Sequence, residues 1–205
     1  WVGVIDGCPA GFPLSVDEIQ YELDRRRPGQ SSVTTSRTEE DRVEILSGVF
    51  EGVTTGTPIG FIVRNKDQRS RDYDEIKDLF RPSHADYTMQ EKYGIWDYRG
   101  GGRSSAREHV VRVVGGAVAR QVLKRLGIFI HGYTSQVGPI VLNKTYHELN
   151  LEETDANVVR CPDSVIAREM ELFIRKVQEE HDSVGGVVSC VIRGVPVGVG
   201  EPVFD

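Results

Sequence analysis

The feature of this sequence that most constrains its fold is the run from Ser105 to Leu126. Its apolar residues cover more than one face of a helix: Val110, Val111, Val113, Val114, Ala117, Val118, Val122 and Leu126. Gly115 and Gly116 each lower helix propensity by about 1 kcal/mol, which is tolerable where a second backbone packs closely. Gly127 suits the position just after the helix end. We therefore predict a central helix over residues 105–126 that is the most buried element of the chain.

Two further helices are predicted from capping residues and apolar stripes. One starts at Ser15, which has capping-box spacing with Glu18, and it ends before Pro28 and Gly29. Another starts at Asp163 or Ser164, and its buried stripe is Ile166, Met170, Phe173, Ile174 and Val177. Residues 76–80 suggest a single helical turn, and the polar stretch 30–42 is interpreted as a surface loop.

Short strands are expected in pairs between the helices. The segments rich in β-branched residues are Val2–Ile5, Val43–Val53, Ile59–Arg64, Ile128–His131, Gln136–Leu142 and Val184–Arg193. Helices that alternate with pairs of strands argue against a doubly wound parallel sheet. The pattern favours an α+β fold in which antiparallel sheets pack on helices.

Composition excludes several classes of function. The net charge of −6 means that bulk attraction to nucleic acid or to an anionic membrane is not expected, so anion binding must come from local arginine clusters. The three cysteines form no CxxC pair, which favours a reduced compartment and argues against a metal site. No apolar run approaches the roughly 18 residues of a membrane span, and no signal peptide is evident. One domain is the preferred organisation for 205 residues.

Residues 81–108 look like an anion-binding segment. Gly100, Gly101 and Gly102 let the backbone approach a ligand closely, and they lead directly into the N-terminus of the predicted helix 105–126. Unpaired N–H groups and the helix dipole both favour negative charge at such a position. Arg103 and Arg107 lie in and just beyond this turn. The segment is therefore predicted to bind a small anion.

A second arginine cluster has two interpretations. Arg25, Arg26 and Arg27 occupy the last turn of the first predicted helix, where the dipole favours cations without any ligand. Alternatively they bind an anion, although three consecutive side chains point in three directions and at most two can reach one ligand.

The order of these motifs resembles the chorismate synthase family. Its segments appear here in family order as VGVIDGCP (2–9), LDRRRPG (23–29), LSGVFEGVTTG (46–56), DQRSRDY (67–73), RPSHADYT (81–88), KYG (92–94), RGGGRSSARE (99–108) and GVGEPVFD (198–205). The resemblance covers essentially the whole chain, and residues 145–163 are its least characteristic part. It implies a β-α-β sandwich with central helices between antiparallel sheets, as one domain over residues 1–205 that is truncated at both ends.

The resemblance also implies an activity. Members of this family convert 5-enolpyruvylshikimate 3-phosphate into chorismate by 1,4-anti elimination of phosphate, with reduced FMN, at the last common step of aromatic amino acid biosynthesis. A cytoplasmic homotetramer that uses no nucleic acid or membrane partner is expected, with NADPH as a candidate reductant. Ser32 stands where some close relatives have an arginine linked to nicotinamide-nucleotide binding, which weakens the case for NADPH.

Site residues follow from the resemblance motif by motif. His84 is implied as the catalytic histidine that acts on the flavin; Arg26, Arg81 and Arg107 as substrate contacts; and Arg103, Ser104 and Ser105 as flavin contacts. The other histidines, His109, His131, His147 and His181, are interpreted as structural. No metal ligands are expected.

Two alternatives to a complete enzyme stay open. The family segments GESHG and KPTSS are expected before Trp1 and after Asp205, so we interpret the chain as a piece of a longer protein and expect residues 1–205 alone to be inactive. The first alternative is a non-catalytic module that holds a phosphate or nucleotide with Arg25–Arg27 and residues 100–107. The second is an inert scaffold in which these arginines are only solvated helix ends.

Overall fold

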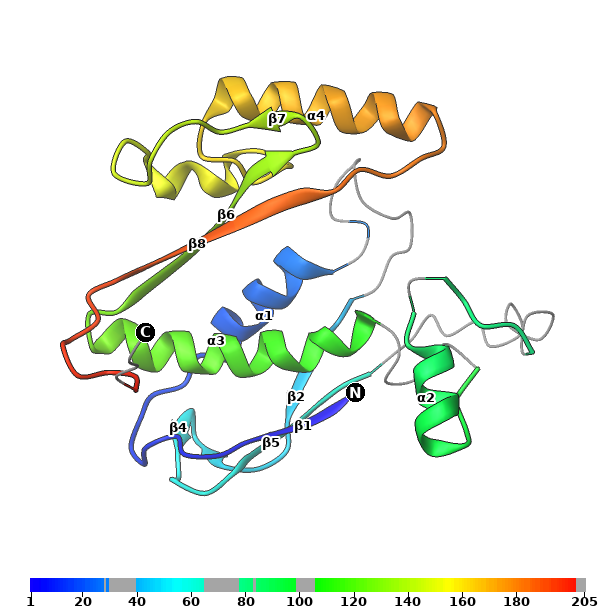
Figure 1. The fold of residues 1–205 in the computed structure, drawn as a ribbon. Helices are drawn as coiled ribbons and strands as arrows, with labels where there is room; N and C mark the ends of the chain where they lie inside the picture. Colours follow the sequence, from blue (N-terminus) through cyan, green and yellow to red (C-terminus); the bar gives the residue numbers. More distant parts are fainter. Residues whose placement is uncertain (28, 30–39, 65–77, 83, 99–105, 202–205) are drawn as a thin grey trace. The chain divides into compact units, whose positions relative to one another are not determined.

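Antiparallel sheets and helices make up the structure, a computed structural model that describes residues 1–27, 29, 40–64, 78–82, 84–98 and 106–201 (Figure 1). The described residues up to Gln121 form an N-terminal unit, and those from Val122 onward form a C-terminal unit. The mixed composition of helices and antiparallel strands confirms the predicted α+β class. None of the helices in the described ranges is long and apolar enough to cross a membrane.

The sheet of the N-terminal unit has three antiparallel strands, β1 (Val2–Ile5), β5 (Ile59–Val63) and β2 (Val43–Ile45), in the order β1-β5-β2. The central strand β5 buries every second side chain, as expected for a strand with one face on a core. Gly3 lies opposite Phe61, and a Cβ at Gly3 would lie 2.2 Å from the phenyl ring. Only glycine therefore lets this ring lie across the neighbouring strand.

The predicted single strand Val43–Val53 is wrong. β2 ends at Ile45, and the chain then forms a separate hairpin of β3 (Val49–Phe50) and β4 (Val53–Thr54). Gly48 and Gly52 have φ of 79° and 78°, a left-handed conformation that interrupts an extended strand. The β-branched composition of this segment did not reveal the two turns.

Helix α1 (Val16–Arg26) forms as predicted. The Ser15 side chain accepts a hydrogen bond from the backbone N–H of Glu18 at 3.2 Å, and the apolar stripe buries Ile19 and Leu23. Helix α2 (Asp86–Tyr93) was not predicted, because it has no apolar stripe and its fully buried side chain is that of Asp86. The expected turn at 76–80 lies partly outside the described residues.

The predicted helix 105–126 appears as a 3₁₀ turn, Ala106–Glu108, followed by α3 (His109–Arg125). Its fully buried residues form one stripe: Val110, Val114, Ala117, Val118 and Gln121. Val111, Val113 and Val122 are half-buried, and Leu126 is 67% exposed. Strand β5 buries three of its five residues, so the prediction that this helix is the most buried element is wrong. The pattern showed which faces are apolar but not which of them another element covers.

A polar pair fastens α3 to the start of α1. The Gln121 side chain accepts from the Ser15 backbone N–H at 2.8 Å and donates to the Ser15 carbonyl at 2.9 Å. Arg120 also forms an ion pair with Glu22 of α1. Since both backbone groups of Ser15 are satisfied, the buried amide of Gln121 adds direction to the packing of the two helices.

The C-terminal unit contains a long antiparallel ribbon. β6 (Phe129–Val137) pairs with β8 (Gly186–Arg193) along its whole length and with the short β7 (Ile140–Val141) at its end. Two separate strands, Ile128–His131 and Gln136–Leu142, had been predicted here. That prediction is wrong, because β6 runs through Gly132 and only a bulge between Thr134 and Gln136 disturbs the register.

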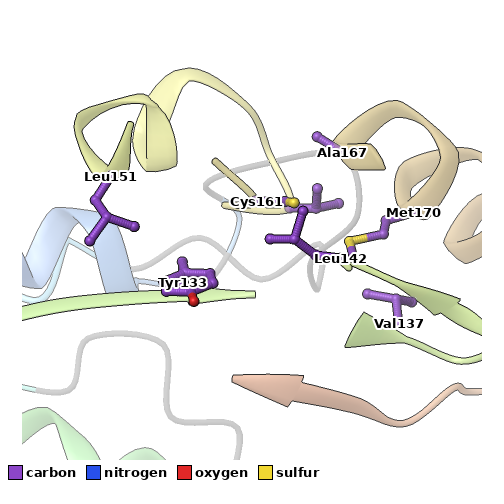
Figure 2. Packing of buried hydrophobic residues seen from close by; sticks show 8 residues of the cluster. Tyr133, Val137, Leu142, Leu151, Cys161, Ala167 and Met170 are labelled. Atoms are coloured by element: carbon purple, nitrogen blue, oxygen red, sulfur yellow. The ribbon is translucent and has the colours of Figure 1, made fainter. Parts of the chain in front are cut away.

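Helix α4 (Ser164–Glu179) begins as predicted, with the Asp163 carboxylate accepting from the backbone N–H groups of Val165 and Ile166. Figure 2 shows Met170 reaching from α4 toward the strand residues of the core. A 3₁₀ helix, Leu151–Ala156, closes another side of this core. The buried members are Tyr133, Val137, Leu142, Leu151, Val159, Cys161, Ala167 and Met170. Burial raises the pKa of the Cys161 thiol, so this cysteine stays protonated as a packing residue.

Candidate functional site: arginines on buried aspartates

Two of the predicted substrate arginines meet at one carboxylate, that of Asp41. Arg107 donates from Nη2 to Oδ1 at 2.7 Å and from Nη1 to Oδ2 at 3.1 Å. Arg26 donates from Nη1 to the same Oδ2 at 3.0 Å. Arg26 comes from the last turn of α1 and Arg107 from the 3₁₀ turn before α3, so the fold brings together two motifs that are far apart in the sequence.

Asp41 is held firmly from its backbone side. Gln20 of α1 donates to the Asp41 carbonyl at 3.4 Å and accepts from the Val43 N–H at 3.2 Å. Asp41 itself has φ of 44°, a left-handed conformation that aspartate adopts more readily than most residues. The Arg107 guanidinium also lies over the ring of Trp1, 4.7 Å from its centroid. These contacts fix both the carboxylate and one of its cationic partners.

The third predicted substrate arginine has its own carboxylate. Arg81 donates from Nε to Oδ2 of Asp86 at 2.8 Å and from Nη2 to Oδ1 at 3.0 Å, a two-point contact that matches the two planar groups. The backbone N–H of Arg81 also donates to Oδ2 at 3.2 Å. Asp86 is the first residue of α2, where the helix dipole favours a negative charge.

The carboxylates and the guanidinium groups of these ion pairs differ in how exposed they are to solvent. The side chains of Asp41 and Asp86 are 0% exposed, whereas those of Arg26, Arg81 and Arg107 are 23%, 17% and 20% exposed. A buried carboxylate without a cation would be strongly unfavourable, so these aspartates require their arginines. The arginines, in contrast, keep a surface that an incoming anion can contact.

His84 lies in the same turn as Arg81. Its backbone N–H donates to the Arg81 carbonyl at 3.3 Å, and its ring Nδ1 is 2.9 Å from the Pro82 carbonyl oxygen. Because a carbonyl oxygen only accepts, Nδ1 carries the hydrogen in this contact, and in the neutral ring Nε2 is then the basic nitrogen. The imidazole is exposed, so Nε2 can meet a ligand.

The predicted flavin contacts cannot be placed in this structure. Arg103, Ser104 and Ser105 lie outside the described residues, as do Gly100–Gly102 and Ser32. In the arginine run, the neighbours of Arg26 turn elsewhere: Arg25 contacts Glu22 at 2.7 Å, and Arg27 lies 3.7 Å from Asp24. This divergence agrees with the expectation that three consecutive arginines cannot share one target.

Within the described part of the chain, no His, Cys, Asp and Glu residues group together as metal ligands.

Sequence reasoning missed the two aspartates. Asp41 stands in the charged run Glu39–Arg42, which was assigned to a surface loop, yet it is fully buried. That assignment is wrong at Asp41, because a local charge pattern does not show which side chain turns inward to meet a distant partner. Asp86 lies within RPSHADYT, five residues after Arg81, and this spacing was a usable but unused signal.

The fold and the site together define an α+β protein in which partly buried arginines are paired with fully buried carboxylates. A family model described as "Chorismate synthase" matches residues 1–205, and the chain belongs to the chorismate synthase family. The resemblance drawn from the motifs is thereby confirmed.

Individual relatives agree with this assignment. Chorismate synthase from Phocaeicola vulgatus is 62% identical over 98% of this chain and 56% of its own length. The enzyme from Christiangramia forsetii is 59% identical over 99% of this chain and 57% of its own length. A solved structure titled "Crystal Structure of Chorismate Synthase" superimposes with a TM-score of 0.76 at 31% identity, covering 98% of this chain and 56% of that one. The chain thus spans little more than half the length of these relatives.

Proposed function

We propose that the protein to which this chain belongs is a chorismate synthase, which eliminates phosphate from 5-enolpyruvylshikimate 3-phosphate in a 1,4-anti sense to give chorismate. The observation that carries the proposal is the convergence of Arg26 and Arg107 on Asp41, in a chain of this family. The substrate carries a phosphate and two carboxylates. Fixed guanidinium groups suit all three, because they bind such anions in a planar two-point geometry and remain charged.

Each arginine has a distinct place in this proposal. Arg26 and Arg107 form one cationic pair from α1 and the 3₁₀ turn, and Arg81 is a separate cation at the start of α2. All three bind and orient the substrate's anionic groups. Their carboxylate partners hold the guanidinium planes before substrate arrives, so less conformational freedom is lost on binding.

Reduced FMN fits the residue types that directly precede the 3₁₀ turn in the sequence. An arginine and two serines, Arg103, Ser104 and Ser105, precede the 3₁₀ turn and α3, and a cation with two hydroxyls is a donor set suited to a phosphate. These three residues would hold the cofactor. When bound, reduced FMN supplies electron density while the phosphate leaves and recovers it afterwards, so the overall reaction involves no net redox change. NADPH as the reductant, a homotetramer and a cytoplasmic location stay predictions.

His84 is assigned a proton-handling role in this proposal. Its Nδ1–H is engaged by the Pro82 carbonyl, which orients the ring and leaves Nε2 as the atom that accepts and returns a proton. The Arg81 carbonyl holds the backbone of the same residue. The turn therefore couples the position of the histidine to that of a substrate-binding arginine.

The test compares His84→Ala with His109→Ala in the full-length protein. His109 is a matched control, because it is also exposed and its Nδ1 also lies 3.0 Å from a backbone carbonyl, that of Ala106. Chorismate formation is measured anaerobically with reduced FMN. We expect His84→Ala to lower kcat by about 100-fold or more, the usual scale for a lost general acid or base, with the melting temperature unchanged. His109→Ala should keep wild-type kcat.

Two outcomes would contradict the proposal. Equal kcat values for the two variants would remove the role assigned to His84. A wild-type protein that binds the substrate but forms no chorismate would instead favour the non-catalytic anion-binding alternative.

A further inference from the structure

We propose that Asp41 is a positioning residue, which holds Arg26 and Arg107 side by side as a preformed clamp for an anionic group of the substrate. The inference rests on the proposed function for the identity of that anion. The clamp itself rests on the contacts of Asp41, a residue that neither its sequence context nor the family motifs had distinguished.

The shared oxygen is the first argument. Oδ2 of Asp41 accepts from Nη1 of Arg26 at 3.0 Å and from Nη1 of Arg107 at 3.1 Å, so the two guanidinium groups must lie next to each other. Two guanidinium groups that contact the same oxygen repel one another, and the negative charge of the carboxylate offsets that repulsion. The charges of these three groups sum to one positive charge, the sign that attracts a phosphate or carboxylate.

Rigidity is the second argument. Arg107 is held by two hydrogen bonds to Asp41 and by a cation–π contact with Trp1, and the two-point hydrogen bonding fixes the plane of the guanidinium as well as its position. The Asp41 backbone is in turn fastened to α1 through Gln20. Since Arg26 also extends from α1, one helix sets the position of both the carboxylate and one of the two cations.

The division of exposure is the third argument. An ion pair that only stabilised the fold could be buried completely, but here the carboxylate is 0% exposed while the two arginine side chains are 23% and 20% exposed. The anionic member is therefore shielded from solvent and from ligands, and each cationic member keeps part of its side chain accessible. This difference in exposure is what is expected when a buried residue supports and orients two binding residues.

The test uses Asp41→Asn in the full-length protein, with Glu22→Gln as the matched control. Glu22 also lies in α1 and forms ion pairs with two arginines, Arg25 and Arg120, neither of which belongs to the clamp. We expect Asp41→Asn to raise KM for 5-enolpyruvylshikimate 3-phosphate by about 10- to 100-fold with kcat reduced far less, because ground-state positioning is lost. Glu22→Gln should leave both constants unchanged.

A second measurement separates this inference from the proposed function. The dissociation constant of inorganic phosphate, measured by calorimetry, does not depend on chorismate chemistry. If the wild-type protein forms no chorismate, the proposed function fails, yet weaker phosphate binding by Asp41→Asn would still support the clamp. If the wild type is active and Asp41→Asn keeps wild-type KM and phosphate affinity, the inference is overturned while the function stands.

Double variants test whether Asp41 acts through its arginines. In an Arg107→Ala background, Asp41→Asn should raise KM much less than it does alone, since part of the clamp is already gone. Fully independent effects on KM would overturn the inference. Should Asp41→Asn fail to fold, Asp41→Glu decides. It keeps the charge but displaces both guanidinium groups, so we expect KM to rise about fivefold or more, and an unchanged KM would overturn the proposal.

Discussion

The two units of this chain differ in what they bury besides apolar side chains. The N-terminal unit places two carboxylates, Asp41 and Asp86, in its interior and joins them to three arginines. In the C-terminal unit, the buried cluster around Met170 is apolar, and the described ion pairs Lys144–Asp163 and Arg175–Glu171 each keep at least one side chain exposed. Both units have a core, but only one of them carries buried charge among the described residues.

This contrast shows why a buried ion pair should not be taken as a device for stability. Removing two charges from water is expensive, and an apolar pair of the same size is often as stable or more so. The described residues of the C-terminal unit pack without a fully buried charged side chain. The N-terminal unit keeps them at the positions where arginines are predicted to bind the substrate, so their retention is better explained by orientation than by stability.

The largest expected effect comes from breaking one buried pair. Asp86→Ala removes the fully buried carboxylate that Arg81 contacts at two points, and it should lower the free energy of unfolding by about 3–5 kcal/mol. The measurement is urea denaturation followed by tryptophan fluorescence. The exposed Asp78→Ala is the control and should change the free energy of unfolding by less than about 0.5 kcal/mol. The double variant Arg81→Met/Asp86→Leu sharpens the comparison, because it should regain most of the stability while substrate KM stays high. A double variant with wild-type KM would show that the pair serves only the fold.

A core truncation in the C-terminal unit should give a slightly smaller effect on stability and none on binding. Met170 is fully buried in the cluster of Figure 2, so Met170→Ala should lower the free energy of unfolding by about 3 kcal/mol. Leu172→Ala on the same helix, where the side chain is 59% exposed, should change it by less than about 0.5 kcal/mol. Among properly folded molecules, both variants should keep wild-type KM. A raised KM for Met170→Ala would contradict the separation of packing from binding.

The smallest effect concerns the surface cap of α4. Asp163→Ala should lower the free energy of unfolding by about 1 kcal/mol at neutral pH, while Asp163→Asn keeps the capping oxygen and should lose only part of that. Lys144, through its hydrogen bond, and the N–H groups of Ile166 and Val165 lower the pKa of Asp163. The carboxylate's contribution is therefore fully present above the unfolded pKa, near 4, and is lost as the pH falls through the lower folded value.

Chemical denaturation of wild type and Asp163→Ala from pH 7 to pH 2.5 would measure this dependence. The difference in unfolding free energy should stay constant down to about pH 5 and shrink below about pH 4. A difference that persists unchanged at the lowest pH would contradict an ionic contribution. Arg175→Ala, which removes an exposed pair with Glu171 on the same helix, should show no comparable pH trend.

Local signals in the sequence predicted the helices that have caps and stripes. Ser15 with Glu18 and Asp163 with Ile166 mark helix starts that the structure confirms, because a cap is decided by residues only two or three positions apart. Helix α2 was not predicted, because it has neither an apolar stripe nor a side-chain cap that could be recognised in the sequence. The predicted strands were less accurate. A turn at Gly48 that was not predicted divides one segment, and a break that was expected near Gly132 does not occur.

The sequence by itself determined the family, through ordered motifs, and it predicted which arginines contact the substrate. It did not reveal that Arg26 and Arg107 share a carboxylate, or that Arg81 holds another. Asp41 lies 15 residues from Arg26 and 66 residues from Arg107, and its neighbours are as charged as it is. Only the tertiary structure determines which of these charged side chains is buried. A carboxylate is stable in the interior only where the fold places cationic side chains beside it, and here those side chains come from distant parts of the sequence.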